Sequence, residues 1–373
     1  MIREICFPFV GESFGGSYRC SLEIIKHLDA ASFKPKIVLH TPGPVEAELR
    51  RQGVNYELFD PPGPPGGSSY PAMARWIASR LPSTIHYLRS HPIDVIHGSE
   101  NLGIILWALA AKVTGHRVVW HVHSRAMFAL RHLPRLAMRY VCVSDYVREL
   151  LPTRFGDLAC VIPNPFGPLP VVDRERARAR LVAERGFPSG GTVIGFCGRL
   201  IDVKRPDVFI EAAHLIANEC SGETAFILLG DGAPARRAAL EALAEARGLA
   251  GRVHFLGFRP DAETLMAGFD ILLVPAETEA FGRVLVEAMR VGTPVIASAS
   301  GGHGEILRSG ETGFLVEAGN PRAFADAALR LMGDQGLHRR IAAEAARAVA
   351  GRYEAGAVTA AVEAVYRDLL GPA

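Results

Sequence analysis

Residues 274–304 read V-P-A-E-T-E-A-F-G-R-V-L-V-E-A-M-R-V-G-T-P-V-I-A-S-A-S-G-G-H-G. The preceding run Ile271–Val274 is a short apolar strand, after which a proline and a loop with Gly282 follow. A helix comes next, Gly292 ends it, and a new strand begins at Pro294. This succession of strand, loop, helix and strand is typical of a βαβ unit in a parallel sheet.

The same alternation extends over the whole chain, which predicts an α/β fold with two Rossmann-like domains and parallel sheets facing across a cleft. We expect one domain at residues 1–170 and another at residues 171–353, followed by a helix in residues 354–373. The proline- and glycine-rich stretch Asp60–Ser69 is expected to be a surface loop. The expected strands are buried on both faces, because they are nearly continuous apolar runs: Pro35–His40, Ile93–His97, Arg117–His123, Tyr140–Ser144, Ala159–Pro163, Thr192–Cys197, Ala225–Leu229, Val253–Leu256, Ile271–Val274, Pro294–Ala297 and Phe314–Val316.

Two glutamates, Glu279 and Glu287, stand out in the opening stretch. If most of the span between them is helical, they lie about 12 Å apart, which suits two carboxylates on different parts of one long ligand. This is too far for the paired carboxyls of a retaining glycoside hydrolase, which lie about 5 Å apart. Backbone N–H groups near Gly282 and Leu285, at the start of the helix, form a natural phosphate site. The alternative is a loop charge and an ordinary surface glutamate.

The segment E-A-F-G-R-V-L-V-E-A-M-R-V-G-T-P-V-I-A-S, residues 279–298, resembles the Glu-x7-Glu signature of retaining nucleotide-sugar glycosyltransferases of family 4 (glycosyl transferases group 1). The resemblance extends over the chain and implies the GT-B fold, with the C-terminal helix packing back on the first domain. It implies that Glu279 contacts hydroxyls of the donor sugar and that Glu287 holds the ribose. The backbone amides that it implies for the sugar and distal phosphate belong to Phe281, Gly282, Arg283 and Val284.

A second group of residues lies in I-G-F-C-G-R-L-I-D-V-K-R, Ile194–Arg205. Arg199 and Lys204 follow a strand that ends at Gly198, and two cations there can hold a diphosphate. Each contact is worth about 4 kcal/mol before desolvation, at about 4 Å and an effective dielectric near 20. That is enough to stabilise a leaving diphosphate without a divalent metal. The alternative is a pair of solvated charges, but the G-R-x4-K pattern is similar to the pyrophosphate site of the family, which does not cover Arg205.

Two further strand ends carry glycine-rich turns, Leu228–Gly232 and Phe255–Pro260. The resemblance implies that they form the nucleoside wall, through Gly230, Asp231 and the backbone near Phe258. The G-D-G-A turn lacks the G-K-[ST] ending of a P-loop, and no G-x-G-x-x-G follows a strand. Neither ATP hydrolysis nor nicotinamide binding is therefore indicated.

Two further groups of candidate site residues lie near the ends of strands in the first half of the chain. Gly15 and Gly16 lie in a loop before a helix, where glycines let the backbone approach a ligand. The resemblance implies that such a loop lies beside the donor phosphate and the acceptor and binds the donor; the alternative is only a tight turn. His121 and His123 share one face of a strand, because side chains alternate along it. The resemblance implies a histidine near the reacting sugar carbon, which we align with His123, with His121 as the second choice. Two histidines can bind a metal, but no third ligand is evident nearby, so we favour a structural or acceptor-positioning role.

Composition limits the other possibilities. The 373 residues are 49% apolar and carry a net charge of +2. The sequence contains no run of eighteen apolar residues, so no membrane-spanning helix is predicted. The start resembles a first strand and not a signal peptide. Six scattered cysteines without a C-x-x-C pair indicate small core residues in a reducing, cytoplasmic compartment. No nucleic-acid partner is predicted.

The expected reaction is transfer of a glycosyl group from a nucleotide-diphosphate-sugar to a glycan, lipid-linked or small-molecule acceptor, with retention and without a metal or other cofactor. The candidate catalytic residues are Glu279, His123, Arg199 and Lys204. No nucleophile opposite the leaving group is evident, so we expect same-face attack by the acceptor. Two alternatives are a nucleotide-sugar epimerase on the same fold and a non-catalytic nucleotide-sugar-binding subunit.

The stretch Ser124–Tyr140 suggests how an acceptor arrives. It has no acidic residue, and Arg131, Arg135 and Arg139 recur at helical spacing among large apolar residues, although Pro134 interrupts the pattern. Such a basic face can lie in the headgroups of an anionic membrane, where each arginine is worth about 1 kcal/mol. The alternative is an ordinary helix with its apolar face in the core.

Overall fold

The computed structural model describes residues 2–11, 15–59, 70–99, 103–124, 135–169, 171–185, 190–220 and 222–371. The chain forms two compact units. Unit 1 consists of Met1–Gly167 and Tyr353–Ala373, and unit 2 is Pro168–Arg352. The expected loop Asp60–Ser69 lies outside the described residues. Among the described helices, none has both the length and the apolar character needed to cross a membrane.

Unit 1 holds, within its described residues, a parallel sheet in which β1 lies between β2 and β4. Its core is apolar: Ile5 and Phe7 of β1 are fully buried, as expected for a strand covered on both faces. Across the sheet the strands are β3 (Glu57–Leu58), β2 (Phe33–Leu39), β1 (Arg3–Phe9), β4 (Val95–Gly98), β5 (Arg117–Val122), β6 (Arg139–Cys142) and β7 (Ala159–Val161). The helices are α1 (Gly16–His27), α2 (Pro44–Arg51), α3 (Tyr70–Ser90), α4 (Gly103–Thr114), α5 (Asp145–Glu149) and α14 (Ala355–Leu370).

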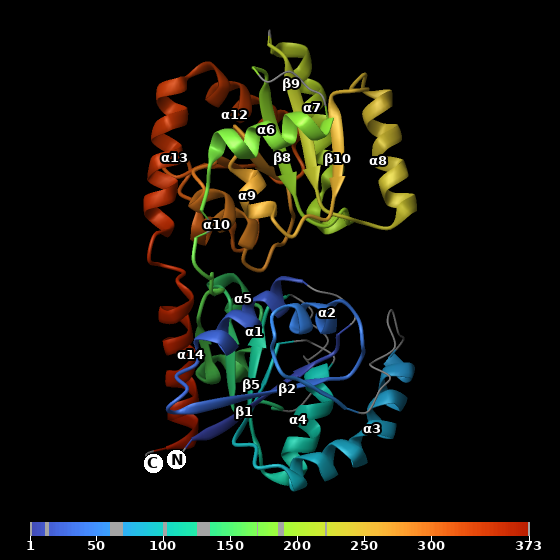
Figure 1. Cartoon of the computed structure of the whole chain (residues 1–373), viewed down its shortest axis with the longest axis vertical. Coiled ribbons are helices and arrows are strands. Elements are labelled where there is room, and N and C mark those ends of the chain that lie inside the picture. Colours follow the sequence, from blue (N-terminus) through green and yellow to red (C-terminus); the bar gives the residue numbers. More distant parts are fainter. Residues whose placement is uncertain are drawn as a thin grey trace. The chain divides into compact units, whose positions relative to one another are not determined.

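Helix α14, from the end of the chain, is part of unit 1 and packs beside α1 (Figure 1). Val358, Val362 and Tyr366 on its inner face are buried in the unit 1 core. The Glu363 carboxylate of α14 accepts a hydrogen bond of 2.6 Å from the backbone N–H of Asp29, just after α1. The amphipathic pattern of the tail therefore serves to cover this sheet.

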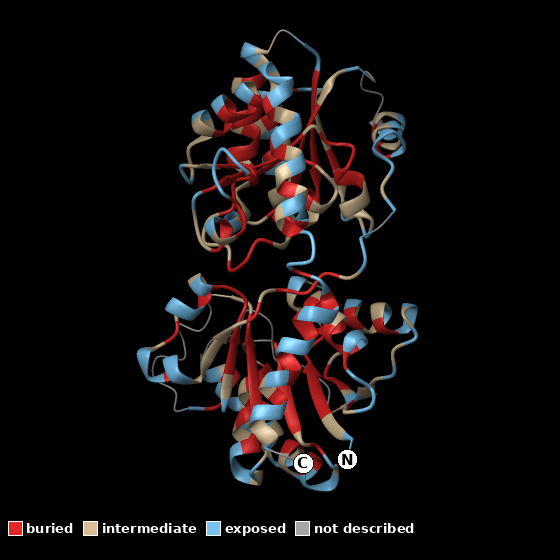
Figure 2. Ribbon diagram, turned by 90° about the vertical axis from the view of Figure 1, so that its left-hand side faces the viewer, coloured by how far each residue is buried: buried red, intermediate tan, exposed pale blue. Residues whose placement is uncertain are grey.

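Unit 2 repeats the strand order of unit 1. Its described strands, all parallel, are β10 (Val253–Gly257), β9 (Thr224–Leu229), β8 (Thr192–Cys197), β11 (Ile271–Val274), β12 (Val295–Ser298) and β13 (Phe314–Val316) in order across the sheet. The helices are α6 (Arg174–Arg185), α7 (Pro206–Glu219), α8 (Pro234–Ala246), α9 (Ala262–Met266), α10 (Arg283–Arg290), α11 (His303–Ile306), α12 (Pro321–Gly333) and α13 (Gln335–Val349). The central strands β9, β8, β11 and β12 are the buried interior of the unit, as the red ribbons of Figure 2 show.

Both sheets have the Rossmann order, in which the first strand lies between the second and the fourth. Ligands bind such sheets at the carboxyl ends of the strands, beside the point where the order reverses. In unit 2 this switch point lies between β8 and β11, which pair through Ile194 and Ile271. The loops after β8 and β11 are therefore the first place to look for a site.

The structure confirms the expected strands to within a few residues. An asparagine caps helix α12, since the Asn320 side chain accepts a hydrogen bond from the Ala323 N–H at the start of this helix. The short strand β3 is an addition that the sequence did not reveal, because two residues carry no periodicity.

One expectation is wrong in the described part of Ser124–Tyr140. Residues 135–138 are not helical, and Arg139 opens strand β6, so Arg135 and Arg139 do not share a helix face. The physical reason is local: Leu136 and Ala137 are buried as the chain enters the strand, and the preceding Pro134 cannot donate an N–H to a helix. Residues 125–134, with Arg131, lie outside the described residues.

Candidate functional site

The loops after β8 and β11 are joined to each other at the switch point of unit 2. The loop after β8 contains a short 3-10 helix, Asp202–Lys204, and the backbone N–H of Glu277 donates to the Val203 carbonyl over 2.8 Å. Arg205 adds ion pairs with Glu277 and with Asp207, the latter at 3.0 Å. These contacts hold the two loops in one fixed arrangement. The sequence reasoning set Arg205 aside, and only the fold reveals its part in this junction.

Lys204 and Glu279 form the central ion pair of the site. Their side chains are only 25% and 20% exposed, so the pair is partly shielded from water. Burial would raise the pKa of the Glu279 carboxyl, but the Lys204 ammonium, helped by His303 and Arg199, holds that pKa below its ordinary value. Glu279 is therefore an ionised acceptor at neutral pH. Arg199, which follows Gly198, is exposed at the edge of the same site.

The loop after β12 holds the backbone around Glu279 through hydrogen bonds. The backbone N–H of Gly302 donates to the Glu279 carbonyl over 2.9 Å, and the Thr278 N–H donates to the Ser300 hydroxyl over 2.9 Å. A Cβ on Gly301 would lie 2.1 Å from the Glu279 carbonyl oxygen, so only glycine fits there. Thr278 itself has φ 57°, a left-handed conformation that is uncommon for a β-branched residue. The backbone that presents Glu279 is thus strained and held by its neighbours.

His303 is a buried residue of this support that the sequence reasoning missed. Its Nδ1–H donates to the Ser298 carbonyl over 2.9 Å, which leaves Nε2 buried and without a hydrogen-bond partner. Burial lowers the pKa of the imidazole, so the ring is neutral at pH 7. A Cβ on Gly282 would lie 2.9 Å from the His303 ring, and Gly282 has φ 97°, so this position requires glycine for two reasons. The G-G-H-G ending of the opening stretch was the available signal.

Helix α10 begins at Arg283, with Gly282 as its N-cap and no side-chain cap. Glu279 therefore lies in the loop before the helix, and only the second half of the Glu279–Glu287 span is helical. The Glu287 carboxylate lies 3.5 Å from the Arg283 guanidinium and is 13% exposed. Phe281 is buried, and Val284 belongs to the first turn of α10.

The remaining expected residues of unit 2 lie on the other side of β8, after β9 and β10. A Cβ on Gly230 would lie 1.9 Å from the Gly198 carbonyl oxygen, so the two glycine turns pack directly together. The Leu200 N–H donates to the Asp231 carbonyl over 2.9 Å. Phe258 is 54% exposed, which leaves an aromatic face open to solvent.

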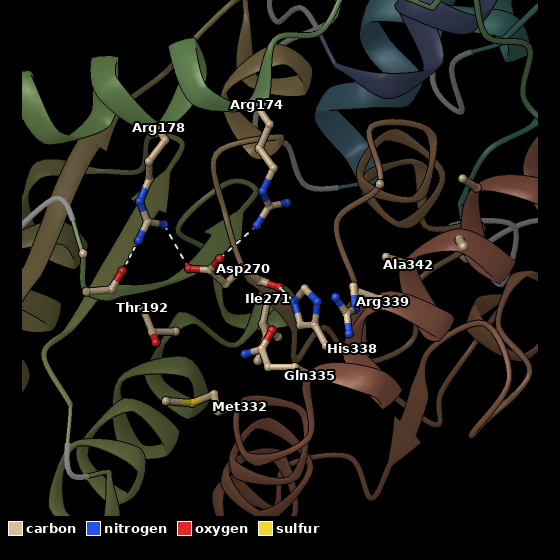
Figure 3. A pocket seen from close by; sticks show the side chains of 15 residues that line it. Arg174, Arg178, Thr192, Asp270, Ile271, Met332, Gln335, His338, Arg339 and Ala342 are labelled. Atoms are coloured by element: carbon tan, nitrogen blue, oxygen red, sulfur yellow. Dashed lines mark hydrogen bonds and ion pairs between the residues drawn. The ribbon is translucent and has the colours of Figure 1, made fainter.

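A separate cavity of about 710 Å³ lies at the amino ends of the central unit 2 strands, opposite the candidate site (Figure 3). Thr192 and Ile271, which begin β8 and β11, line it. Arg178 and Arg174 both pair with the Asp270 carboxylate there at 2.9 Å (Figure 3). The imidazole Nε2–H of His338 donates to the backbone carbonyl of Asp270 over 2.8 Å. These polar groups satisfy one another, so the candidate site remains at the carboxyl ends of the strands.

In unit 1, Gly15 is extended and Gly16 is the first residue of α1. A Cβ on Gly15 would meet no atom within 4 Å, so packing does not require a glycine there. His121 is fully buried near the end of β5, and His123 lies just beyond it. Their rings stack with centroids 4.3 Å apart, which confirms that they share a face.

The described arginines of Ser124–Tyr140 have partners inside unit 1. Arg135 donates to the Arg154 carbonyl over 2.9 Å, and Arg139 pairs with Asp368 of α14 at 2.5 Å. Both arginine side chains are therefore partly occupied by contacts within unit 1.

Two Rossmann-ordered units, together with a likeness to solved structures over 98% of the chain, define a GT-B fold. A family model described as glycosyl transferases group 1 matches residues 177–348, and one for glycosyltransferase family 4 matches residues 14–167. The chain belongs to this family of glycosyltransferases.

Individual relatives agree with this assignment. The D-inositol 3-phosphate glycosyltransferase of Rhodococcus opacus is 39% identical over 183 residues, which cover 47% of this chain and 40% of the relative. The 2-deoxystreptamine N-acetyl-D-glucosaminyltransferase of Streptomyces fradiae is 35% identical over 261 residues, 69% of this chain and 60% of the relative. The chain therefore spans 40% and 60% of the lengths of these two relatives. The structure of HepE from Anabaena in complex with UDP-glucose has the same fold, with a TM-score of 0.80 at 24% identity, covering 98% of this chain and 99% of that one.

Proposed function

We propose that the chain transfers a glycosyl group from a nucleotide-diphosphate-sugar to an acceptor, with retention at the anomeric carbon and without a metal ion. The observation that carries the proposal is the Lys204–Glu279 pair, held at the switch point of unit 2 by the loop that contains Gly301. A cation for the departing diphosphate and a carboxylate for the sugar are the two groups that such a transfer needs at one place.

Lys204 and Arg199 neutralise the diphosphate as it leaves. Lys204 is the only lysine in the sequence of Pro168–Arg352, where every other permanent cation is an arginine. An ammonium is a compact charge that can turn from Glu279 to a phosphate oxygen, because it has three donors on a flexible stem. The N–H groups of the first turn of α10, beside Gly282, offer the phosphate further donors.

Glu279 accepts hydrogen bonds from hydroxyls of the donor sugar, which its lowered pKa favours because the carboxylate stays ionised. Glu287, one turn into α10, holds the ribose hydroxyls. The exposed ring of Phe258 and the turn at Gly230 and Asp231 form the wall beside the base.

In the transfer, the acceptor oxygen bonds to the anomeric carbon on the face from which the diphosphate departs. The bond between that carbon and the phosphate oxygen breaks, and the acceptor proton passes to the departing phosphate oxygen. Configuration is thereby retained without a covalent enzyme intermediate. His123 and the Gly15–Gly16 turn shape the reacting side, next to the donor phosphate and the acceptor.

The acceptor is a glycan, a lipid-linked sugar or a small molecule. The named relatives glycosylate inositol phosphate and 2-deoxystreptamine according to their descriptions, which favours a small polar acceptor as the first to be tested. A role in glycan, glycolipid or envelope polysaccharide synthesis and a peripheral contact with an anionic membrane remain predictions from the sequence.

The donor is tested by protection of Lys204 from a lysine acetylating reagent, read out by peptide mass spectrometry. UDP is the first probe, because a protein of the same fold binds it, followed by GDP and ADP. The fitting nucleotide should slow acetylation of Lys204 and leave Lys34 of unit 1, whose side chain is 72% exposed, unchanged. Equal acetylation of Lys204 with and without every nucleotide would contradict the proposed site.

Incubation of the chain with the matching nucleotide-sugar then separates the alternatives. A transferase consumes the donor in proportion to added acceptor, whereas an epimerase converts the donor alone into a new nucleotide-sugar. In a non-catalytic subunit, bound nucleotide still protects Lys204 from acetylation, but the donor is consumed neither with acceptor nor without it.

A further inference from the structure

Three potential metal ligands meet in unit 1. Within the part of the chain that the structure describes, Cys20 of α1, His121 of β5 and His123 form a group whose ligand atoms all lie within 4.8 Å of one another. The sequence showed only the two histidines, because Cys20 is a hundred residues away. The fold brings the missing third ligand to the same point, with Cys20 and His121 fully buried.

The donor set of one thiolate and two imidazoles suits zinc. Zinc takes these ligands tetrahedrally, at about 2.3 Å from sulfur and about 2.0–2.1 Å from nitrogen, which places ligand atoms about 3.6 Å apart. The three atoms therefore need to move together by only about 1 Å to close around an ion. Three protein ligands leave a fourth position for water, as in zinc sites that are not fully closed by the protein.

The groups behind His121 are arranged as a second layer of such a site. Its Nδ1 lies 3.2 Å from Nε2 of His97 on β4, and Nδ1 of His97 lies 2.5 Å from the hydroxyl oxygen of Tyr366 on α14. If the His121 Nδ1–H donates to His97 and the His97 Nδ1–H donates to Tyr366, Nε2 of His121 carries a lone pair. A metal-bound histidine almost always donates its other N–H to such a partner.

Nε2 of His121 is itself buried without a hydrogen-bond partner. Leaving a polar atom in this state costs about 1–3 kcal/mol, which a metal bond would remove.

We propose that Cys20, His121 and His123 bind one zinc ion, which joins α1 to the end of β5. Binding releases the thiol proton of Cys20 to solvent and leaves a thiolate on the metal. His123, just beyond β5, then acts as a ligand of this ion. The site is distinct from the residues of unit 2 that hold the donor phosphates, and it does not depend on the proposed transfer reaction.

The test is zinc content of the full chain, measured by mass spectrometry after dialysis against metal-free buffer. The wild type and Cys142→Ser, a matched change at another buried cysteine of unit 1, should each retain about one zinc per chain. Cys20→Ser and His121→Gln should lose it. His97→Phe, which keeps the ring packed on Phe7, should weaken zinc binding about 10- to 100-fold.

Cobalt provides a second readout that needs no variant. The metal-free wild type titrated with Co²⁺ should develop a thiolate-to-cobalt absorption in the near ultraviolet, which equimolar zinc abolishes. Wild-type chain that retains no zinc and shows no such absorption would overturn the proposal and leave a hydrogen-bonded core cluster. If Cys20→Ser does not fold, the cobalt spectrum of the wild type decides.

Discussion

Replacement of Gly301 by alanine should destabilise unit 2 and displace Glu279. Gly301 has φ 61°, and its missing Cβ would lie 2.1 Å from the Glu279 carbonyl oxygen and 2.8 Å from the Glu279 nitrogen. An ordinary contact needs at least about 3.4 Å, so the Glu279 backbone must retreat by more than 1 Å. Gly304 is the matched control, because a Cβ there would meet nothing within 4 Å.

The magnitude follows from three effects of the added methyl group. A left-handed alanine costs about 1–2 kcal/mol, partly offset by the smaller freedom of the unfolded chain. The clash costs about 1–3 kcal/mol, and loss of the hydrogen bond from Gly302 to Glu279 costs about 1 kcal/mol. We expect a loss of about 3 kcal/mol for Gly301→Ala. Gly304→Ala should change stability by less than about 1 kcal/mol, in the stabilising direction because residue 304 is helical.

The assay is urea unfolding followed by two signals. All three tryptophans, Trp76, Trp107 and Trp120, belong to unit 1, so their fluorescence reports that unit. Circular dichroism reports both units. Gly301→Ala should lower the midpoint of the transition that only circular dichroism detects and leave the fluorescence transition in place.

Turnover provides the functional readout for the same pair of variants. A displacement of about 1 Å at a reacting group can cost about 100-fold in rate, so Gly301→Ala should be at least that much slower than Gly304→Ala. Equal unit 2 stability of the two alanine variants, or a shift of the fluorescence transition instead, would refute the reasoning.

Four other predictions concern the donor carboxylate, the metal requirement, the buried histidines and the basic stretch. Glu279→Gln should lower turnover by orders of magnitude while UDP still protects Lys204, since the diphosphate contacts remain; near-wild-type turnover would contradict the assignment. Transfer should persist in excess EDTA, and restoration of lost activity by magnesium or manganese would place a metal on the phosphates, whereas restoration by zinc alone would point to the Cys20 site. His97 and His121 of the metal-free chain are buried with lowered pKa values, so the unfolded state takes up protons first as the pH falls below 6.5. Unit 1 should therefore lose about 2 kcal/mol for each histidine between pH 7 and pH 5, measured by fluorescence-detected urea unfolding, and a pH-independent midpoint would exclude this. Binding to anionic vesicles, measured by co-sedimentation, should weaken with salt and in a chain carrying both Arg131→Glu and Arg135→Glu; no binding at low salt would favour a soluble acceptor.

The local pattern of the chain was enough to predict its architecture. Strands such as Thr192–Cys197 and Ile271–Val274 are apolar runs bounded by turn residues, and their spacing with helices permits few arrangements other than parallel sheets. The segment around Glu279 and Glu287 also revealed the family, because glycines and carboxylates recur there at spacings set by one loop and one helix.

Contacts between distant segments could not be predicted in this way. Nothing near Glu279 in the sequence indicates that Lys204 pairs with it, that Gly301 supports its backbone, or that His303 is buried beside Gly282. Likewise, the sequence showed His121 and His123 without Cys20, and it suggested a helix face at Arg135 and Arg139, where the structure has a non-helical segment that leads into strand β6.

The chain by itself therefore determined the order of strands and helices, the family and the residues that follow each strand, because these depend on periodicity and short spacings. The tertiary structure alone decided which strand ends lie together, since sheet order differs from chain order and places β8 beside β11. The partners of Glu279 and the glycine at 301 follow from that order, and Cys20, His121 and His123 come together through the separate sheet of unit 1. They depend on distances across the fold, which no local pattern of residues encodes.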